Sequence, residues 1–276
     1  MRFALFACFV VAGSSACTDD LTASSSGQGL VSGNRLAANR LAANRLAANR
    51  LAANRLAANR LAANLATVGA LLETPEGREV LSFIVSCALP GDVVLVAEKD
   101  GVTYEFPGEI GLAPQWEHAA LNKAGQGWVS ACLFARVNAH DVALPVSLRG
   151  AHKQLATTEE ERAGWPLEEG AFYGDFFRPL EEPIVWIACR GADQATLGEV
   201  GGLVDRDCAE PDPANPGFTL CGFTYAGDCG DFAAEYACED FNEDGTYYRR
   251  CHEAPVAGHH RCGQTFHQVI TTYVAP

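Results

Sequence analysis

Six exact tandem copies of the pentapeptide Asn-Arg-Leu-Ala-Ala run from Asn34 to Ala63. Five residues of α-helix turn by about 500°, so successive leucines step around the helix by about 140° and mark no single face. An amphipathic core helix is therefore excluded. Ala, Leu and Arg favour helix and Asn disfavours it, which predicts a partly helical, solvated stalk over residues 34–64. The alternative is a β-solenoid with inward leucines, although this repeat would complete only about one and a half coils.

The N-terminus has the layout of an export signal, which we assign to residues 1–16. Arg2 precedes an apolar stretch over residues 3–13, and that stretch is shorter than the roughly 20 residues of a membrane span. Small residues then lead to Cys17, as in lipoprotein signals whose cysteine thiol is acylated. We therefore expect a lipid anchor at Cys17, a linker over residues 17–33, and a periplasmic or surface-exposed place in the bacterial cell envelope. Plain secretion is the alternative.

Charge divides the mature chain into two parts. The repeats contain six Arg and no acid, whereas the chain from Leu65 onward has 13 Lys and Arg against 32 Asp and Glu, a formal charge of −19. An acidic body excludes nucleic acid as a partner, so the expected contact is with the membrane, through the lipid anchor. Charge does not identify a protein or glycan partner.

Nine cysteines follow Cys17, and in an exported chain they predict disulfides. Cys87 and Cys132 lie in apolar helical runs, and we expect them to pair. Local pairs are expected within a Cys-rich lobe over residues 206–276, including Cys251 with Cys262. Cys189 is then the unpaired thiol, shielded in a buried strand. The cysteines concerned are Cys87, Cys132, Cys189, Cys208, Cys221, Cys229, Cys238, Cys251 and Cys262.

Residue patterns predict a mixture of helices and strands. Thr74 and Pro75 indicate the start of a helix that ends before Pro90, and a second, largely buried helix is expected over residues 128–139. A β-hairpin is expected over residues 93–106 with its turn at 99–101. Further strands are expected at 142–148, 184–189 and 268–274. Because helices and strands do not alternate regularly, the prediction is an α+β fold: a single disulfide-stabilised globular domain over residues 65–276, loop-rich toward its C-terminus and preceded by the stalk.

Several segments resemble uncharacterised exported lipoproteins of myxobacterial type. The resemblance covers the body from residue 65 onward and is carried by GREVLSFIVSCAL, GWVSACLFARVNAH, SLRG, CGFTYAGDC and ACEDFNEDGTYYRRCHE. It implies an envelope location and a single folded unit, and it implies no activity.

Asp240, Asn242 and Asp244, followed by Gly245, reproduce the first half of a calcium-binding loop. Alternating oxygen side chains followed by glycine let a backbone curl around a hard cation, so calcium is the cofactor to consider. The second half does not match, because the twelfth position is Cys251 and not a bidentate Glu. The alternative is a tight hairpin turn at Asp244 and Gly245 that needs no metal.

Four histidines near the C-terminus, His252, His259, His260 and His267, suggest a transition-metal site together with Cys251 and Cys262. Their spacing matches no zinc motif, and a cysteine in a disulfide cannot ligate as a thiolate. A solvated loop closed by a disulfide is the alternative.

Hydrolase motifs such as Gly-x-Ser-x-Gly and His-Glu-x-x-His are absent from the sequence. A cysteine nucleophile would need a base, for which His118, His140 and His152 are the candidates. Glutamates that could serve a glycosidase occur in runs typical of solvated surface. They are Glu159, Glu160, Glu161, Glu168, Glu169, Glu181 and Glu182.

These observations favour a non-enzymatic envelope lipoprotein that presents an acidic, disulfide-rich domain for binding or for a structural role. The alternative is a secreted hydrolase of a type the sequence does not identify. A cleft with converging cysteine, histidine and carboxylate side chains would favour the hydrolase.

Overall fold

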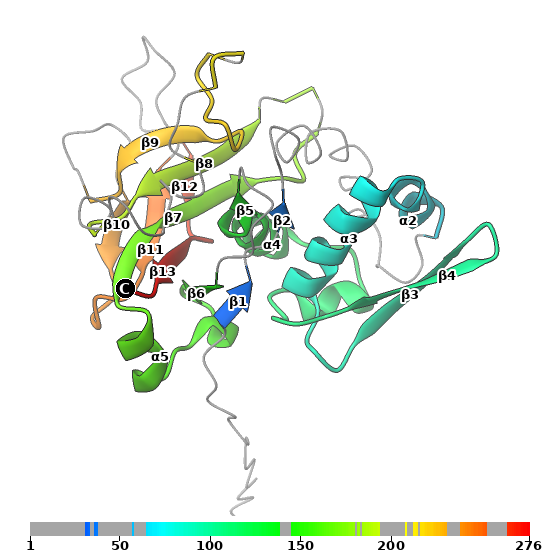
Figure 1. Ribbon diagram of the computed structural model, residues 1–276, viewed down its shortest axis with the longest axis horizontal. Helices are drawn as coiled ribbons and strands as arrows, with labels where there is room; N and C mark the ends of the chain where they lie inside the picture. Colours follow the sequence, from blue (N-terminus) through cyan, green and yellow to red (C-terminus); the bar gives the residue numbers. More distant parts are fainter. Residues whose placement is uncertain are drawn as a thin grey trace, which may run out of the picture.

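The computed structural model describes residues 31–33, 36–37, 57, 65–138, 145–179, 181–182, 184–193, 208, 212–214, 216–230, 238–252 and 264–276 (Figure 1). These residues form a mixed α/β structure with several sheets and four disulfides. Among them, no helix is long and apolar enough to cross a membrane.

Helices α2 (Leu65–Leu72) and α3 (Pro75–Ala88) open the continuous part of the structure. The predicted start of α3 is confirmed, because Thr74 Oγ1 accepts a hydrogen bond from the Gly77 amide at 3.0 Å and Pro75 begins the helix. A proline fits there since the first helical amides have no partner within the helix. Helix α3 buries one face, including Val80 and Ile84.

The predicted β-hairpin is confirmed as β3 (Val94–Lys99) and β4 (Val102–Pro107). Its two-residue turn consists of Asp100 and Gly101, both with positive φ, at 53° and 77°. Positive φ at both central residues matches the twist of a hairpin, and Asp-Gly is a favoured pair for it.

Helix α4 (Lys123–Ala135) is the buried helix that the sequence predicts, shifted toward the N-terminus. It begins earlier because the Asn122 side chain accepts a hydrogen bond from the Gly125 amide at 2.8 Å and caps the first turn. It ends at Ala135, after which Val137–Asn138 forms the short strand β5.

The largest sheet has six strands in the order β1-β6-β13-β7-β8-β9. All neighbours are antiparallel except β8 and β9, which are parallel. The strands are β1 (Val31–Gly33), β6 (Pro145–Arg149), β13 (Ile270–Val274), β7 (Leu167–Asp175), β8 (Val185–Arg190) and β9 (Thr224–Asp228). The three expected strands correspond to β6, β8 and β13. Strand β7, the longest, was missed.

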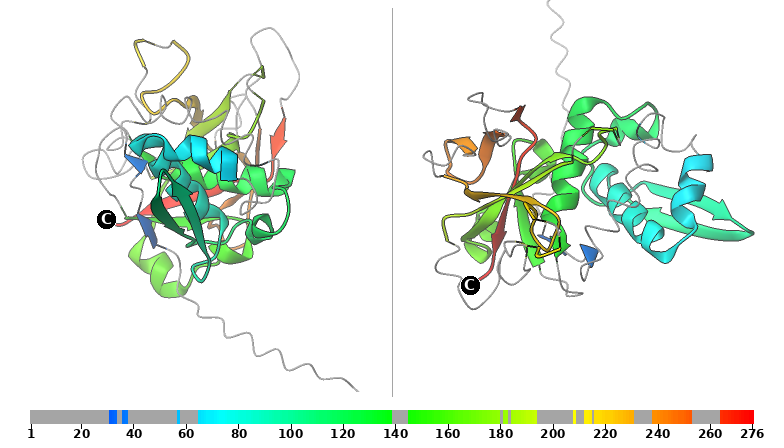
Figure 2. Two further views of the ribbon diagram at one scale, coloured as in Figure 1. Left: turned by 90° about the vertical axis from the view of Figure 1, so that its right-hand side faces the viewer. Right: turned by 90° about the horizontal axis from the view of Figure 1, so that it is seen from above.

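Both faces of this sheet are covered. Phe172 and Trp186 point to the face on which α4 packs, whereas Tyr173 and Ile187 belong to a second buried cluster on the other face. That second face lies under a three-stranded sheet of β10 (Cys238–Phe241), β11 (Tyr248–His252) and β12 (Thr265–Phe266). Figure 2 shows α4 between the large sheet and the unit formed by α2, α3 and the β3–β4 hairpin.

The predicted disulfide between Cys87 and Cys132 is confirmed, with a Cα–Cα distance of 6.0 Å between α3 and α4. Cys208 pairs with Cys221 and Cys238 with Cys251, which agrees with local pairing in the C-terminal part.

Two pairing predictions were wrong. Cys189 is not the free thiol but is bonded to Cys229, because β9 returns beside β8 in parallel and brings together cysteines 40 residues apart. Cys251 is bonded to Cys238 and not to Cys262, because the two lie opposite each other in the β10–β11 pair. Cys262 lies outside the described residues.

The solvated stalk is not confirmed. Most of the repeat lies outside the described residues, but the described parts contact the domain. Strand β2 (Leu36–Ala37) pairs with β5 in parallel, and the carbonyl of Ala57, a buried residue, accepts a hydrogen bond from the Leu121 amide at 2.9 Å. Strand β1, which lies in the expected linker, forms the edge of the large sheet beside β6, where an extended segment satisfies unpaired backbone groups.

Deleting residues 34–63 should therefore lower the free energy of unfolding by about 1–2 kcal/mol, because the β2 pairing and the buried Ala57 would be lost. Thermal unfolding of the full-length and shortened proteins measures this directly. An unchanged melting temperature would instead support a solvated stalk.

Candidate functional site

A cleft of about 430 Å³ lies between the end of β6 and the β10–β11 hairpin. One wall consists of the loop after β6, residues 149–157, with the short helix η3 (Lys153–Leu155), and of helix α5 (Glu159–Gly164). The other wall is the hairpin turn, residues 242–247. Its volume is within the range of about 300–1,000 Å³ that is typical of small-ligand sites.

Backbone packing and backbone hydrogen bonds fix the conformation of the loop wall. Gly150 lies so close to β13 that a Cβ atom there would be 2.7 Å from the Val269 carbonyl oxygen. Four backbone amides of the loop donate hydrogen bonds within the loop itself, those of His152, Gln154, Leu155 and Ala156. The wall is therefore preorganised, and these amides are not free for a ligand.

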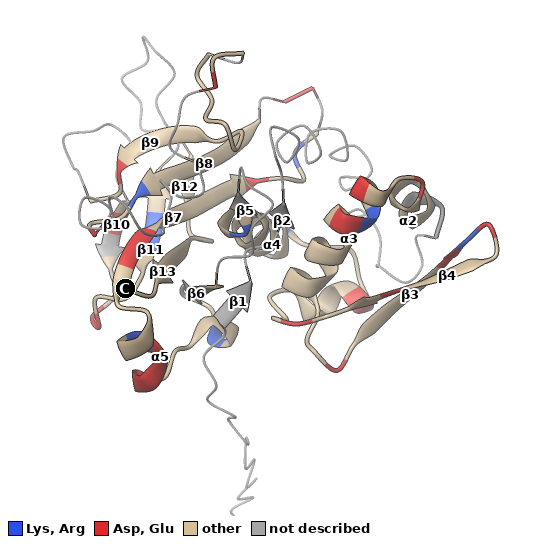
Figure 3. Cartoon of the chain, viewed as in Figure 1, with Lys and Arg blue, Asp and Glu red and all other residues tan. Residues whose placement is uncertain are grey.

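The charge of the cleft is opposite to that of the body. Arg149, Lys153 and Arg162 line it, and Asp244 is the one carboxylate among the described lining residues. Within the described part of the chain, none of the three cations forms a direct ion pair. Acidic residues are distributed over α3 and the β3–β4 hairpin, and the first turn of α5 also carries three glutamates that do not line the cleft (Figure 3). The cleft is a local cationic site on an acidic protein.

His152 does not add to this positive charge. Burial, followed by the nearby charge of Lys153, lowers the pKa of its imidazole below the usual value. Its Nδ1 accepts a hydrogen bond from the Gln154 amide at 3.2 Å, so the neutral ring carries its proton on Nε2. The ring contacts Trp128 edge to face, with centroids 5.3 Å apart.

Arg149 joins the cleft to a buried polar network. Its Nε donates to Ser147 Oγ at 3.0 Å, and the same hydroxyl donates to Glu161 Oε1 at 2.7 Å. Its Nη2 donates to the Trp165 carbonyl, and its guanidinium lies 3.6 Å from the centroid of the Tyr273 ring. The charge is thus stabilised by an anion, a π face and two oxygen acceptors, and the guanidinium is held in one orientation.

Glu168 lies on the other side of Tyr273, in the neighbouring strand β7. Burial raises the pKa of its carboxyl, and the charge of Asp193 raises it further. The hydroxyl of Tyr248 donates to the carboxylate, but Oε1 of Glu168 has no hydrogen-bond partner among the described residues. A buried carboxylate with one unsatisfied oxygen destabilises the folded state.

Glu168→Gln should therefore stabilise the protein at pH 7, by about 1 kcal/mol. Because the folded-state pKa is raised, the native protein binds this proton more tightly than the unfolded chain does. The protonated wild-type carboxyl carries no such cost, so the advantage of the variant should be complete above the raised folded-state pKa. It should shrink as the pH falls from there to the ordinary glutamate pKa, below which both states are protonated. Denaturant unfolding at pH 7 and pH 4 measures the difference. Glu105→Gln, at an exposed position of β4, serves as the control.

The expectation that the glutamate runs are solvated was wrong for three members. Glu161, Glu168 and Glu169 are 5%, 6% and 0% exposed. Glu161 of α5 contacts Ser147 of β6, and the other two lie in β7, an internal strand of the large sheet. Glu161 is bonded to Ser147 and Glu168 to Tyr248, and neither lines the cleft. They do not form the pair of carboxylates that a glycosidase would present to a sugar.

The predicted calcium residues lie in the β10–β11 hairpin. Asn242 Oδ1 accepts three hydrogen bonds within the turn, from the Thr246 amide at 2.7 Å, the Thr246 hydroxyl at 3.2 Å and the Tyr247 amide at 3.0 Å. Gly245 has a φ of 63°, as a tight turn requires. Asp244 lines the cleft, and the Asp240 side chain lies outside the described residues. Calcium binding stays a prediction, while the turn already uses the Asn242 oxygen.

The predicted histidine-rich metal site is described only in part. Both ring nitrogens of His252 already have partners. Glu239 Oε1 lies 3.3 Å from Nε2, and Thr265 Oγ1 lies 3.1 Å from Nδ1. Cys251 is in a disulfide, so it cannot ligate as a thiolate. His259 and His260 lie outside the described residues, and His267 lies between β12 and β13.

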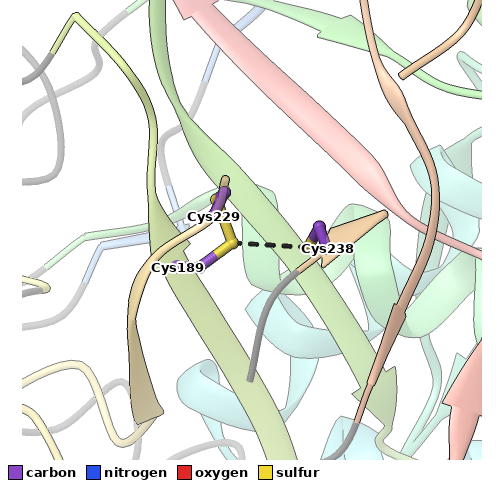
Figure 4. A group of neighbouring side chains, drawn as sticks. All are labelled: Cys189, Cys229 and Cys238. Carbon is purple, nitrogen blue, oxygen red and sulfur yellow. Dashed lines mark hydrogen bonds between the residues drawn. A yellow bond between two sulfur atoms is a disulfide. The ribbon is translucent and has the colours of Figure 1, made fainter. Parts of the chain in front are cut away.

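Three cysteine sulfurs gather between the two sheets, those of Cys189, Cys229 and Cys238, all within 4.8 Å of one another (Figure 4). Cys189 Sγ lies 3.6 Å from Cys238 Sγ, but both atoms are in disulfides and carry no hydrogen, so this is a sulfur–sulfur contact and not a hydrogen bond. Every cysteine that the structure describes is bonded to another, which leaves none of them as a nucleophile beside His118 or His152. His140 lies outside the described residues.

A smaller cavity of about 320 Å³ adjoins α3 and α4. Arg136, at the end of α4, donates to Ser86 Oγ at 2.7 Å and contacts Glu109 Oε2 at 3.1 Å, and the Ser86 hydroxyl donates to the same carboxylate at 2.6 Å. Phe83 covers the guanidinium at 4.6 Å. These contacts satisfy a nearly buried cation, which gives the cluster a structural role between α3 and α4.

The cationic wall was missed at the level of the sequence. Its signal is local: Arg149, Lys153 and Arg162 stand close together in a body with few cations. Sequence spacing alone does not bring residues 242–247 opposite them, because that approach depends on the stacking of the two sheets.

The chain matches none of the protein-family models, curated proteins or solved structures with which it was compared.

Proposed function

We propose that this protein is a non-enzymatic envelope lipoprotein whose acidic, disulfide-rich domain binds a small anionic ligand in the cleft between β6 and the β10–β11 hairpin. The observation that carries the proposal is the group of three cations, Arg149, Lys153 and Arg162, on the wall of a cleft in an otherwise acidic protein. A local positive site inside a negative field selects small anions that can enter the cleft and repels larger acidic molecules.

Binding without chemistry fits the geometry better than hydrolysis does. Nδ1 of His152 is already an acceptor for a backbone amide, and no described side chain in the cleft is a nucleophile activated by that ring. The cations are held by a preorganised loop and by the buried network under Arg149. A rigid cleft of this kind lowers the entropic cost of capturing a ligand.

The test is the affinity of the mature protein for simple anions, acetate and inorganic phosphate, by calorimetry or NMR titration at low ionic strength. The double variant Lys153→Gln, Arg162→Gln should weaken binding by about tenfold or more, and added salt should weaken it in the wild type. Lys99→Gln, in the β3–β4 hairpin where Lys99 pairs with Glu73, is the matched control and should bind normally. Equal anion affinity of the wild type, the double variant and the Lys99→Gln variant would overturn the proposal.

The envelope location rests on the sequence alone and has its own test. Mass spectrometry of the protein from membranes should find an acylated N-terminal Cys17. An unmodified N-terminus at Cys17 or Thr18 would instead indicate secretion.

A further inference from the structure

The geometry points to a small acidic sugar as the ligand of the cleft: a free hydroxylated ring with a single carboxylate. This inference rests on the proposed anion-binding function and specifies its chemistry. Three features support it: the opposite charges of the two walls, the backbone amides of the loop that are already hydrogen-bonded, and the apolar and aromatic side chains that line the rest of the cleft.

The two walls have opposite character. Arg149, Lys153 and Arg162 form the cationic wall, whereas the hairpin wall presents the exposed carboxylate of Asp244. A carboxylate bound at the cations places the rest of the ligand toward Asp244. A second negative charge there would be repelled, while hydroxyl groups can donate to the Asp244 oxygens.

Much of the donor set that a phosphate group would use is already occupied in this cleft. Phosphate sites use a series of free backbone amides or bidentate arginines. Here four amides of the loop are already used within it, and the Nε and Nη2 groups of Arg149 are bound to Ser147 and to the Trp165 carbonyl. Lys153 and the rest of the cationic wall can still neutralise one carboxylate, which requires fewer donors.

The remaining lining suits a ring with alternating polar and apolar edges. Leu155 and Ala156 give the loop wall an apolar part, and Tyr247 contributes an aromatic ring from the hairpin. The amide oxygen of Asn242 and the hydroxyl of Thr246 are bonded to each other within the turn. Asp244 and Tyr247 are thus the polar groups of the hairpin that we assign to the sugar hydroxyls.

The experiment compares ligands that differ in one feature each, using the mature protein with its disulfides intact. D-galacturonate carries both carboxylate and hydroxyls, D-galactose lacks the carboxylate, acetate lacks the ring, and inorganic phosphate carries more charge. Galacturonate should bind about tenfold or more tightly than galactose, acetate or phosphate. An oligogalacturonide should bind more weakly per unit than the monosaccharide, because its further carboxylates meet Asp244 and the acidic body.

Two variants locate the ends of the ligand. Lys153→Gln should weaken the binding of both galacturonate and acetate. Asp244→Asn should weaken the binding of galacturonate by about fivefold and leave the affinity for acetate unchanged. Glu243→Gln, an exposed neighbour in the same turn that does not line the cleft, is the matched control. Phosphate or acetate that binds as tightly as galacturonate, still through Lys153, would overturn the sugar assignment and leave the anion-binding function intact. Absence of binding by every anion would overturn both.

Discussion

Replacing Arg149 with methionine should lower the free energy of unfolding by about 3–5 kcal/mol, although the aliphatic part of the side chain is kept. Arg149 is 3% exposed as a residue, and its guanidinium is connected through Ser147 to Glu161, which is itself 5% exposed. Without the cation, the Glu161 carboxylate remains in the interior with no positive charge to offset its desolvation. Denaturant unfolding at pH 7 measures the loss.

Lys153→Met separates this effect from the role of charge in the cleft. Lys153 lines the same cleft but is exposed, so its replacement should change stability by no more than about 0.5 kcal/mol while weakening anion binding. If Arg149→Met changed the free energy of unfolding as little as Lys153→Met does, the result would contradict the buried network around Arg149.

Removing the disulfide between α3 and α4, with Cys87→Ala and Cys132→Ala together, should cost roughly 4 kcal/mol. The two cysteines are 45 residues apart, and opening a loop of that length restores much conformational entropy to the unfolded chain. Both side chains are fully buried, so the loss of packed sulfur adds to the effect. Thermal unfolding of oxidised wild type and double variant provides the comparison.

The double variant Cys208→Ala, Cys221→Ala is the control, because it also removes two buried cysteines but opens a loop of only 13 residues. Its expected cost is roughly 3 kcal/mol. A larger loss from this pair than from Cys87 and Cys132 would show that local strain or packing, and not loop length, decides the contribution.

Local chemistry made α3 and the β3–β4 hairpin predictable. Thr74 and Pro75 determine where the helix begins through groups within one turn, and Asp100 and Gly101 supply the backbone angles of the hairpin. The pairing of Cys87 with Cys132 could be expected for a related reason, since two buried helical cysteines have few other partners.

Features that depend on distant pairing were not predictable in the same way. Strand β7 carries Glu168 and Glu169 directly after its first residue, Leu167, and their charges indicate surface, yet both are buried in the sheet. The bond between Cys189 and Cys229 requires β9 to lie parallel to β8, and residue patterns do not encode that order. The cleft depends on the same long-range placement, because its two walls are about 90 residues apart in the sequence.

The contact between the Cys189–Cys229 and Cys238–Cys251 bonds has a consequence for how the protein is made. Thiols this close can exchange partners during oxidation, and the shortest loop available would join Cys229 to Cys238, which are neighbours in the sequence order of cysteines. The native bonds instead join residues 40 and 13 positions apart.

We therefore expect strand pairing to select the correct partners before the sulfurs are joined, so that the cross-links preserve an arrangement chosen by β-sheet formation. Chains oxidised too early should then need disulfide isomerisation to reach the native bonds, and refolding from the reduced protein should give a higher native yield with a disulfide isomerase than without one.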